Sequence, residues 1–297
     1  MNILTLDIEE WFHLLETDYS RNESDWDHFE IRIHHNMERI FRILEDTHSR
    51  GTFFCLGWIA RKYPEVIRQI SDLGYEVGCH SASHHLVHQL SPTAFREDTI
   101  SAVKRLEDIL GKKVTAYRAP GFSITEATPW AFEILAEAGI THDSSVFPAP
   151  RAHGGYPGFT SHHPCLISID PLFHSSLNSS FLIPHSSLIK EFPITTTKLL
   201  GKDIVFGGGG YFRLFSYPLI KRWTRQQQYM LAYIHPRDLD AGQPMLPGLS
   251  PFRKFKSYYG LKGAEQKLRK WLTNFQFTDI ATFDKQYNWD NAQVINL

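Results

Sequence analysis

The sequence predicts an α/β fold with a mainly parallel sheet, arranged as a barrel whose active site lies at the carboxyl ends of the strands. Strand-like and helix-like segments alternate along the chain, and several of the apolar strands end in a charged or metal-binding residue. Strands are expected near residues 2–7, 52–57, 75–79, 114–118, 140–143, 203–206, 229–235 and 276–282. Helices are expected near residues 37–48, 64–73, 92–110, 125–138, 217–227 and 263–275.

For the clearest of these helices, the sequence predicts both the start and the end. Ser91 is an N-cap residue and is followed by a proline, which is well tolerated in the first turn of a helix. Apolar residues then recur at helical spacing until Gly111, a residue type that commonly stops a helix. We therefore expect a helix over 92–110.

The polar residues that end the apolar strands suggest an active site. Carboxyl ends of parallel strands meet at one rim of a barrel, so residues distant in the sequence would meet there. Each of them separately has an ordinary explanation as a cap, a turn or a surface charge, but the set together favours a site. The residues are Asp7 with Glu9, then His80, Arg118, Asp143 and His235.

Two histidines four residues apart, His80 and His84, are the most informative feature of the set. If the segment turns helically, the two imidazoles lie one above the other and each offers a nitrogen to the same divalent ion. Such a pair recurs by chance among surface residues, so its weight depends on the other strand ends.

Composition favours one elaborated domain over residues 1–297 and excludes several functional classes. Hydrophobic positions make up 42% and charged positions 21%, and no linker or repeat divides the chain. A formal net charge of −1 gives no basic face for nucleic acid or for a membrane surface. The segment 148–187, rich in Pro, Gly, His and Ser, is expected to form a loop-rich substrate rim, and 260–297 a C-terminal helix and strand.

The compartment is predicted from the cysteines and the N-terminus. The three cysteines lie mostly inside apolar runs and are expected to be reduced core thiols. No export signal and no apolar run long enough to span a bilayer is found. We therefore expect a cytoplasmic protein without a transmembrane segment. The cysteines are Cys55, Cys79 and Cys165.

The order of these motifs resembles the polysaccharide deacetylase family, which is carbohydrate esterase family four and includes the chitooligosaccharide deacetylases. Nearly the whole chain is similar to a subgroup found with bacterial exopolysaccharide and surface-glycan genes. The resemblance implies a distorted (β/α) barrel of seven or eight strands, a divalent metal, most commonly Zn²⁺, and hydrolysis of an N-acetyl group on a sugar. It rests on Asp7 with Glu9, His80-x-x-x-His84, Tyr117-Arg-Ala-Pro-Gly-Phe-Ser, Asp143-Ser-Ser-Val-Phe-Pro, Gly208-Gly-Gly-Tyr-Phe-Arg213 and Tyr233-Ile-His-Pro.

One motif departs from the family, which has two adjacent aspartates in its first motif, a base followed by a metal ligand. Here Ile8 follows Asp7, but alternation along a strand projects Asp7 and Glu9 to the same side and Ile8 toward the core. We therefore expect Asp7 to be the base and Glu9 the third metal ligand beside His80 and His84. Glu10 is the second choice of ligand, more consistent with a solvent-facing position.

The chemistry of such a site is that of a metal hydrolase. Two neutral imidazoles and one carboxylate leave open positions on a zinc-like ion, which lowers the pKa of bound water to roughly 7. Asp7 would accept the proton of the water as a general base, and His235 would protonate the leaving amine. Arg118 would keep Asp7 ionised and oriented.

Substrate-binding residues are predicted next to these motifs. A backbone N–H near Tyr117 or in the glycine run would stabilise the oxyanion. Tyr211 is a candidate to stack on a sugar ring, and Arg213 a candidate to bind a carboxylate or phosphate of the substrate. The full set of predicted positions is Tyr117, Pro120, Gly209, Tyr211 and Arg213.

The leading prediction is a metal-dependent N-deacetylase acting on an N-acetylated sugar or short glycan, with a carrier-linked surface-glycan intermediate as the expected substrate. A metal-dependent amidohydrolase that acts on a small non-sugar amide is one alternative. An inactive carbohydrate-binding relative is another, although the presence of Asp7, both histidines, Arg118 and His235 argues against it. The sequence does not choose the sugar, the carrier or the oligomeric state.

Overall fold

The computed structural model describes residues 1–15, 23–150, 154–169 and 187–297. The chain forms two compact units, each built from segments that are distant in the sequence. The first unit comprises Met1–Phe53, Asp72–Glu76 and Thr195–Phe283. The second comprises Phe54–Ser71, Val77–Ile194 and Asp284–Leu297.

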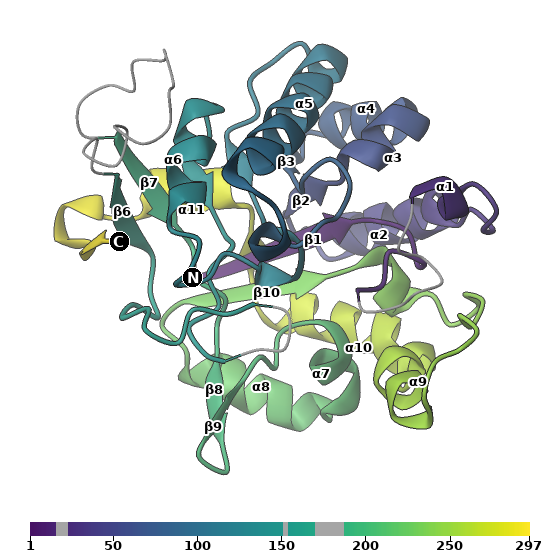
Figure 1. The fold of residues 1–297 in the computed structure, drawn as a ribbon. Helices are drawn as coiled ribbons and strands as arrows, with labels where there is room; N and C mark the ends of the chain where they lie inside the picture. Colours follow the sequence, from purple (N-terminus) through teal and green to yellow (C-terminus); the bar gives the residue numbers. More distant parts are fainter. Residues whose placement is uncertain (16–22, 151–153, 170–186) are drawn as a thin grey trace. The chain divides into compact units, whose positions relative to one another are not determined.

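The strands of the first unit centre on β1 (Asn2–Ile8), which pairs in parallel with β10 (Met230–Ile234) and with β11 (Phe277–Thr278). Figure 1 shows β1 and β10 side by side. Both are buried along most of their length, which explains their continuous apolar sequences. A separate antiparallel hairpin joins β8 (Thr197–Leu199) to β9 (Lys202–Ile204).

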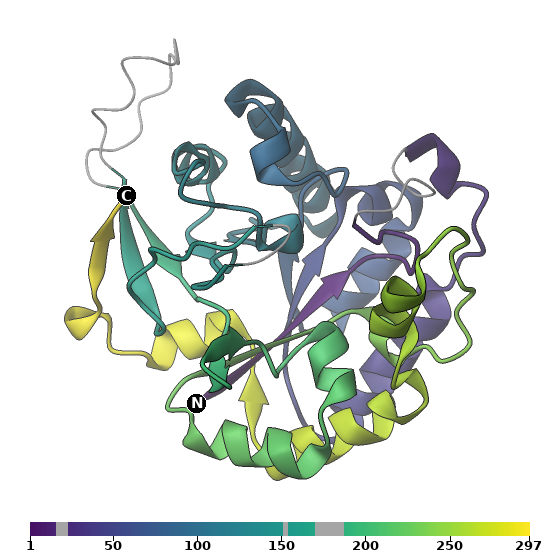
Figure 2. The ribbon, with the colours of Figure 1, turned by 60° about the horizontal axis from the view of Figure 1, so that its bottom comes forward.

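The helices of the first unit pack through their apolar faces. Helices α8 and α10 lie beside each other (Figure 2), where Trp271 donates to the Thr224 hydroxyl at 2.9 Å and packs against the Phe212 ring. The helices are α1 (Glu23–Trp26), α2 (Ile33–Asp46), α7 (Gly209–Leu214), α8 (Tyr217–Gln226), α9 (Pro251–Tyr258) and α10 (Leu261–Asn274). Helix α11 (Ile280–Gln286) begins in this unit and ends in the second.

The strands of the second unit pair in the order β3-β4-β5-β7-β6-β12. All recorded pairs are parallel except β6 with β7, and β12 lies beside β6 (Figure 2). The strands are β3 (Glu76–Cys79), β4 (Ala116–Tyr117), β5 (His142–Asp143), β6 (Cys165–Ile169), β7 (Ser187–Glu191) and β12 (Val294–Asn296). The first residue of β3 belongs to the first unit, and β2 (Thr52–Cys55) contributes two residues to each unit.

The helices of the second unit are α3 (Gly57–Lys62), α4 (Pro64–Asp72), α5 (Pro92–Leu110) and α6 (Trp130–Glu137). Helix α5 has the ends that its sequence predicts. The Ser91 hydroxyl accepts from the Ala94 N–H at 3.2 Å, and Gly111 adopts a left-handed conformation with φ 64°.

Several predicted elements are corrected by the structure. The strand expected over 276–282 pairs only at Phe277–Thr278 and is followed by α11. The helix expected from 125 begins at Trp130, because Thr125 and Thr128 close a turn in which the Thr125 N–H donates to the Thr128 hydroxyl at 2.9 Å. The end of the predicted strand 52–57 begins α3, and the glycine run leads into α7, which begins at Gly209.

The predicted substrate rim, 148–187, is only partly within the described residues. Residues 151–153 and 170–186 lie outside them, and Cys165–Ile169 forms strand β6. The thiols of Cys55, Cys79 and Cys165 are buried, which confirms their prediction as core residues. Among the described residues, no helix has the length and apolar character needed to cross a membrane. The prediction that 1–297 is a single domain remains a prediction.

Candidate metal-dependent hydrolase site

Three predicted residues of the first unit meet at the carboxyl end of β1. Asp7 is in β1, Glu9 follows it directly, and His235 follows the parallel neighbour β10. The Nε2 atom of His235 lies 3.4 Å from Glu9 Oε1 and 3.8 Å from Asp7 Oδ2. Ile8 between the two carboxylates is fully buried. The alternation predicted from the sequence is therefore confirmed, and Asp7 and Glu9 are directed to the same imidazole.

The other ring nitrogen of His235 is held by Asp238. Nδ1 lies 2.9 Å from Asp238 Oδ2, which also accepts the His235 backbone N–H at 3.0 Å. The second oxygen of Asp238 accepts from Arg213 Nε at 3.0 Å. Because a carboxylate only accepts, Nδ1 carries a proton and the ring orientation is fixed with Nε2 toward Asp7 and Glu9.

The ionisation of this pair follows from its surroundings. Burial alone would lower the pKa of His235, but the hydrogen bond and charge of Asp238, with the charges of Glu9 and Asp7, raise it to about 9. Burial opposes ionisation of Asp238, yet the pKa of its carboxyl is held below the usual range by His235 and by the cations Arg213 and Arg237.

Glu10 corrects a prediction, because it is 1% exposed and does not face solvent. Its Oε1 accepts the backbone N–H groups of Arg32 and Ile33, both at 2.7 Å, at the start of α2. Glu10 therefore satisfies donors that a helix N-terminus leaves without partners. Burial raises the pKa of Glu10 to about 7.

The histidine pair of the second unit lies in a loop, not in the helical turn assumed from its spacing. Ser81 and His84 have φ angles of 65° and 60°, in the left-handed region that non-glycine residues rarely adopt. The loop nevertheless brings the two rings together, with centroids 5.4 Å apart and potential ligand nitrogens within 4.8 Å of each other. The four-residue spacing correctly predicted that the two imidazoles lie together, but the helical backbone assumed for the segment was wrong.

The orientation of His80 suits a metal ligand. Its Nδ1 lies 2.7 Å from the backbone carbonyl oxygen of Arg118. A carbonyl only accepts, so Nδ1 carries the proton and Nε2 carries the lone pair that a metal requires. His80 is 2% exposed, so water has little access to its hydrogen bond with the Arg118 carbonyl.

The loop is held from both sides. The N–H groups of Gly57 and Trp58, at the start of α3, donate to the carbonyls of Ser81 and Ala82 at 2.8 and 2.9 Å. The Ala82 N–H donates to Asp98 of α5 at 2.8 Å. A Cβ on Gly57 would lie 2.9 Å from the Ala82 Cα, so this approach requires glycine.

Arg118 is fully buried in the second unit. Its Nε donates to the Ser144 carbonyl at 3.0 Å and its Nη2 to the Ser144 hydroxyl at 2.8 Å, while the guanidinium lies 4.4 Å from the centre of the Phe54 ring. The backbone of Arg118 thus orients His80, and its side chain is fixed by the segment after β5.

A pair of buried carboxyl groups lies next to that segment, where Asp143 of β5 stands opposite Glu191 of β7. Asp143 accepts from the Ser145 hydroxyl at 2.6 Å and from the Ser145 N–H at 3.0 Å, and Glu191 accepts the Val146 N–H at 3.1 Å. Burial and the charge of Asp143 raise the pKa of Glu191 well above its usual range. Glu191 is therefore the partner that holds a proton more readily.

Two family models match the chain, one after the other. Residues 26–142 match the family described as polysaccharide deacetylase, and residues 144–285 match one described as a domain of unknown function (DUF3473). The amino-terminal match, over 26–142, is to a polysaccharide deacetylase domain. The region matched by the deacetylase family includes His80, His84 and Arg118.

Parts of the chain are also similar to two named deacetylases. Over 110 residues the chain is 29% identical to a peptidoglycan deacetylase of Helicobacter pylori, which covers 36% of this chain and 36% of that protein. Over 96 residues it is 28% identical to a peptidoglycan-N-acetylglucosamine deacetylase of Bacillus cereus, covering 32% of this chain and 35% of that protein. The match thus spans about a third of the length of each of these relatives.

The likeness of the fold extends further than these alignments. A crystal structure from Mycobacterium smegmatis, assigned to the polysaccharide deacetylases, matches with a TM-score of 0.61 at 16% identity. The match covers 100% of this chain and 94% of that one. Together with the parallel pairing in both units, this confirms the α/β fold class predicted from the sequence.

The predicted substrate-binding residues differ in how far they are exposed to solvent. The Tyr117 ring is fully buried and packs edge-on against Phe95, and Pro120 is buried as well. Tyr211 is 47% exposed and stacks on Phe215. Gly209 starts α7 with φ 49°, where a Cβ would lie 3.1 Å from the Tyr233 hydroxyl oxygen.

Arg213 has an internal role that replaces the predicted one. It is 4% exposed, and its Nε, Nη1 and Nη2 donate to Asp238, to the Tyr259 carbonyl and to the Lys256 carbonyl, at 3.0, 2.7 and 3.1 Å. Because its guanidinium nitrogens already donate to groups of the protein, Arg213 is not suited to bind a substrate anion. We assign Arg213 to the positioning of Asp238.

Sequence reasoning missed Asp238, Asp98 and Glu191. Asp238 had a local signal, since an acidic residue three positions after an N-cap is the pattern of a capping box, which His235 and Asp238 form. Glu191 and Asp98 had none, because each acts on a segment far away in the sequence.

Proposed function

We propose that the protein is a metal-dependent N-deacetylase that removes an N-acetyl group from an amino sugar. The orientation of His80 is the observation that carries the proposal, because its Nδ1 is bound to the Arg118 carbonyl and its ring lies beside that of His84, with one potential ligand nitrogen from each within 4.8 Å of the other. Two imidazoles placed together in this way suit a metal ion. The deacetylase domain match supports the same reaction class.

The proposed ligands are His80, His84 and Glu9. Two imidazoles and one carboxylate are the donor set of catalytic zinc sites, which keep a position open for water or substrate. A bound Zn²⁺ would supply Lewis acidity and lower the pKa of a water molecule to roughly 7. The identity of the ion as zinc is part of the proposal.

The chain's own residues would move the protons. Asp7 accepts a proton from the attacking water as general base, and His235 donates one to the amine nitrogen as the carbon–nitrogen bond breaks. The hydrogen bond from His235 Nδ1 to Asp238 holds the ring so that its Nε2 faces the reaction. Arg118 is proposed to orient Asp7.

The proposed substrate is a monosaccharide or short glycan of bacterial polysaccharide or surface-glycan assembly, carried on a phosphate-linked carrier. The buried thiols of Cys55, Cys79 and Cys165 support a reducing compartment, and we propose the cytoplasm. The named activities of the relatives, on peptidoglycan, support an N-acetylated amino sugar as the reacting group.

Metal content tests the proposal independently of activity. We expect purified wild-type protein to hold about one zinc ion per chain and the variant His80→Ala/His84→Ala to hold essentially none. The matched control is His85→Ala/His88→Ala, which removes two exposed histidines from the adjoining segment. Equal metal in all three proteins would refute the site.

Acetate release then tests the reaction. Metal-loaded protein should release acetate from N-acetylated nucleotide sugars, lipid-linked sugars or short oligosaccharides. Turnover of small non-sugar amides with none of any N-acetylated sugar would refute the sugar deacetylase and favour an amidohydrolase.

A further inference from the structure

Helix α9 of the first unit, labelled in Figure 1, carries an exposed aromatic stripe. Phe252, Phe255 and Tyr259 are 72%, 49% and 50% exposed, although burial of an aromatic ring is normally favourable. Their spacing of three and then four residues places them on one side of the helix. The rings of Phe255 and Tyr259 are in contact, with centroids 4.7 Å apart. The helix therefore presents an aromatic surface to solvent.

The stripe is fixed in place from inside the unit. The buried Arg213 donates from Nη1 to the Tyr259 carbonyl at 2.7 Å and from Nη2 to the Lys256 carbonyl at 3.1 Å. The Tyr258 hydroxyl of the same helix accepts the Leu246 N–H at 2.9 Å. Because the helix is already anchored, a partner would not have to order it on binding.

Two further exposed apolar side chains lie on α7, which packs against α9. They are Tyr211 and Leu214, and each is one residue after a position that contacts α9. A Cβ on Gly210 would lie 3.2 Å from the Lys256 carbonyl oxygen, and Arg213 donates to the same carbonyl. Single apolar residues on a surface are ordinary, but five on two packed helices form a patch of the kind that marks an interaction surface.

Basic side chains are mixed with these rings. Residues 241–264 contain four Lys or Arg and no Asp or Glu, a formal charge of +4, whereas the whole chain carries −1. Lys254, Lys256 and Lys262 are exposed and are in no ion pair within the described residues. Lys256 Nζ lies 5.8 Å from the centre of the Phe252 ring, so a cation and an aromatic ring occupy the same part of the surface. Such a surface suits a partner that is both anionic and apolar.

A phospholipid bilayer with anionic headgroups has both properties. Aromatic side chains enter the boundary between headgroups and acyl chains, while lysines stay at the level of the headgroups. A neutral glycan would match the rings but not the charge. A purely ionic partner would match the charge but not the exposed Phe252 and Phe255. The mixture of rings and lysines therefore favours the bilayer.

The α9 surface consists of Phe252, Lys254, Phe255, Lys256 and Tyr259. We propose that the α9 surface binds the face of an anionic phospholipid bilayer and so attaches the protein to it peripherally. Binding does not depend on the deacetylase reaction, since these residues take no part in the proposed metal binding or proton transfer. Its use, to bring the enzyme to substrates held in the membrane, rests on the proposed function.

Vesicle flotation tests the α9 surface. Wild-type protein should float with vesicles of phosphatidylcholine and phosphatidylglycerol in equal parts, and far less with phosphatidylcholine alone. Lys254→Gln/Lys256→Gln should lower the partition coefficient about 30-fold, the factor expected for two lysines at an anionic surface. Phe252→Ser/Phe255→Ser should lower it at least about tenfold, because two rings are lost from the interface.

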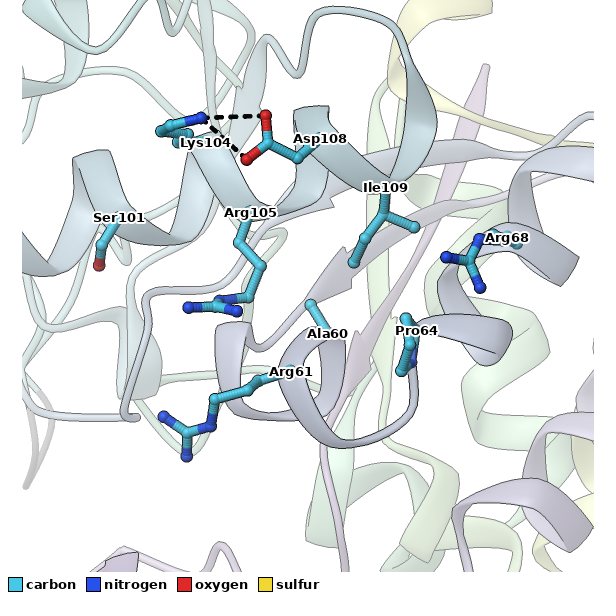
Figure 3. Close-up of a pocket in the computed structure, with 9 residues that line it drawn as sticks. All are labelled: Ala60, Arg61, Pro64, Arg68, Ser101, Lys104, Arg105, Asp108 and Ile109. Carbon is cyan, nitrogen blue, oxygen red and sulfur yellow. Dashed lines mark hydrogen bonds and ion pairs between the residues drawn. The ribbon is translucent and has the colours of Figure 1, made fainter.

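Two matched controls remove the same kinds of groups from other places. Arg68→Gln/Arg105→Gln removes two exposed cations that line an open depression on α3, α4 and α5, where no lining residue is aromatic (Figure 3). Leu73→Ser/Ile100→Ser removes two exposed apolar side chains. Both should float as wild type. Zinc content and acetate release from a water-soluble N-acetyl sugar should be unchanged in all four variants, which separates failure of this surface from failure of the proposed function.

The proposal would be overturned if wild-type protein did not float with anionic vesicles. It would be overturned as well by an equal loss of binding in Arg68→Gln/Arg105→Gln and in Lys254→Gln/Lys256→Gln, which would be an effect of net charge alone. Binding of chitotetraose, or self-association of the protein, that Phe252→Ser/Phe255→Ser abolishes while vesicle binding is unchanged would assign the stripe to a glycan or to a second copy instead.

Discussion

At the scale of single residues, the chemistry depends on which nitrogen of each imidazole carries a proton. The Arg118 carbonyl fixes this for His80 and the Asp238 carboxylate fixes it for His235, each through Nδ1. The Nε2 atoms are thereby given opposite tasks, one to offer a lone pair to a metal and the other to face Asp7 and Glu9. The sequence analysis predicted neither the Arg118 carbonyl nor the Asp238 carboxylate as the group that orients an imidazole.

Substitution of Asp7 by asparagine should separate the base from the ligands. Asp7→Asn is expected to keep its zinc and to lose about 10²–10⁴-fold in turnover, the usual contribution of a positioned general base. Glu9→Gln should lose zinc. Elemental analysis of both variants with acetate-release rates checks this, and metal loss in Asp7→Asn with retention in Glu9→Gln would reverse the two roles.

Removal of His235 should affect amide substrates selectively. An amine leaves poorly unless it is protonated, whereas a phenolate leaves without help. His235→Ala is therefore expected to slow deacetylation of an N-acetyl sugar far more than hydrolysis of an activated acetyl ester such as 4-nitrophenyl acetate. Similar losses of kcat on both substrates would argue against a general-acid role.

At the scale of elements, the histidine loop is shaped by the helices that follow the strands. The amino end of α3 binds two carbonyls of the loop, and Asp98 in the first part of α5 binds one of its N–H groups. Two residues, Ser81 and His84, are held in the left-handed region as a result. Packing of α3 and α5 thus decides a backbone that the His80/His84 spacing suggested to be helical.

Gly57→Ala should disturb this loop without altering a ligand. The added Cβ would lie 2.9 Å from Ala82 Cα, so the loop or α3 has to shift. We expect a loss of about 1–3 kcal/mol in the free energy of unfolding and a weaker affinity for zinc. Gly263→Ala is the control, because its Cβ would meet nothing within 4 Å. Unchanged zinc affinity in Gly57→Ala would show that the close approach does not position the loop.

At the scale of the whole molecule, buried carboxyl groups make stability depend on pH. Glu76 in the first unit is half-buried, accepts hydrogen bonds from the Thr52 hydroxyl and the Ala281 N–H, and has its pKa raised by desolvation of its carboxyl from 4.5 to about 7. The folded state therefore binds a proton that the unfolded state releases above about pH 4.5. The contribution of Glu76 to the free energy of unfolding is therefore complete below about pH 4.5 and declines as the pH rises toward 7.

Urea unfolding between pH 4.5 and 8 measures this effect. Glu76→Gln, which cannot ionise, should remove a decline of up to about 3 kcal/mol from the wild-type profile over pH 4.5–7. Glu45→Gln replaces an exposed carboxylate of the same unit and should leave the profile unchanged. Parallel profiles for wild type and Glu76→Gln would show that Glu76 is ionised in the folded protein.

The sequence by itself determined the fold class, the ends of α5, the same-side placement of Asp7 and Glu9, and the proximity of His80 to His84. These depend on local periodicity and capping, which adjacent residues encode. Tertiary structure decided the backbone of the histidine loop, the burial of Glu10 and Arg213, and the pairing of Asp143 with Glu191. Such contacts join residues far apart in the chain, so burial and charge set them only after the elements have packed.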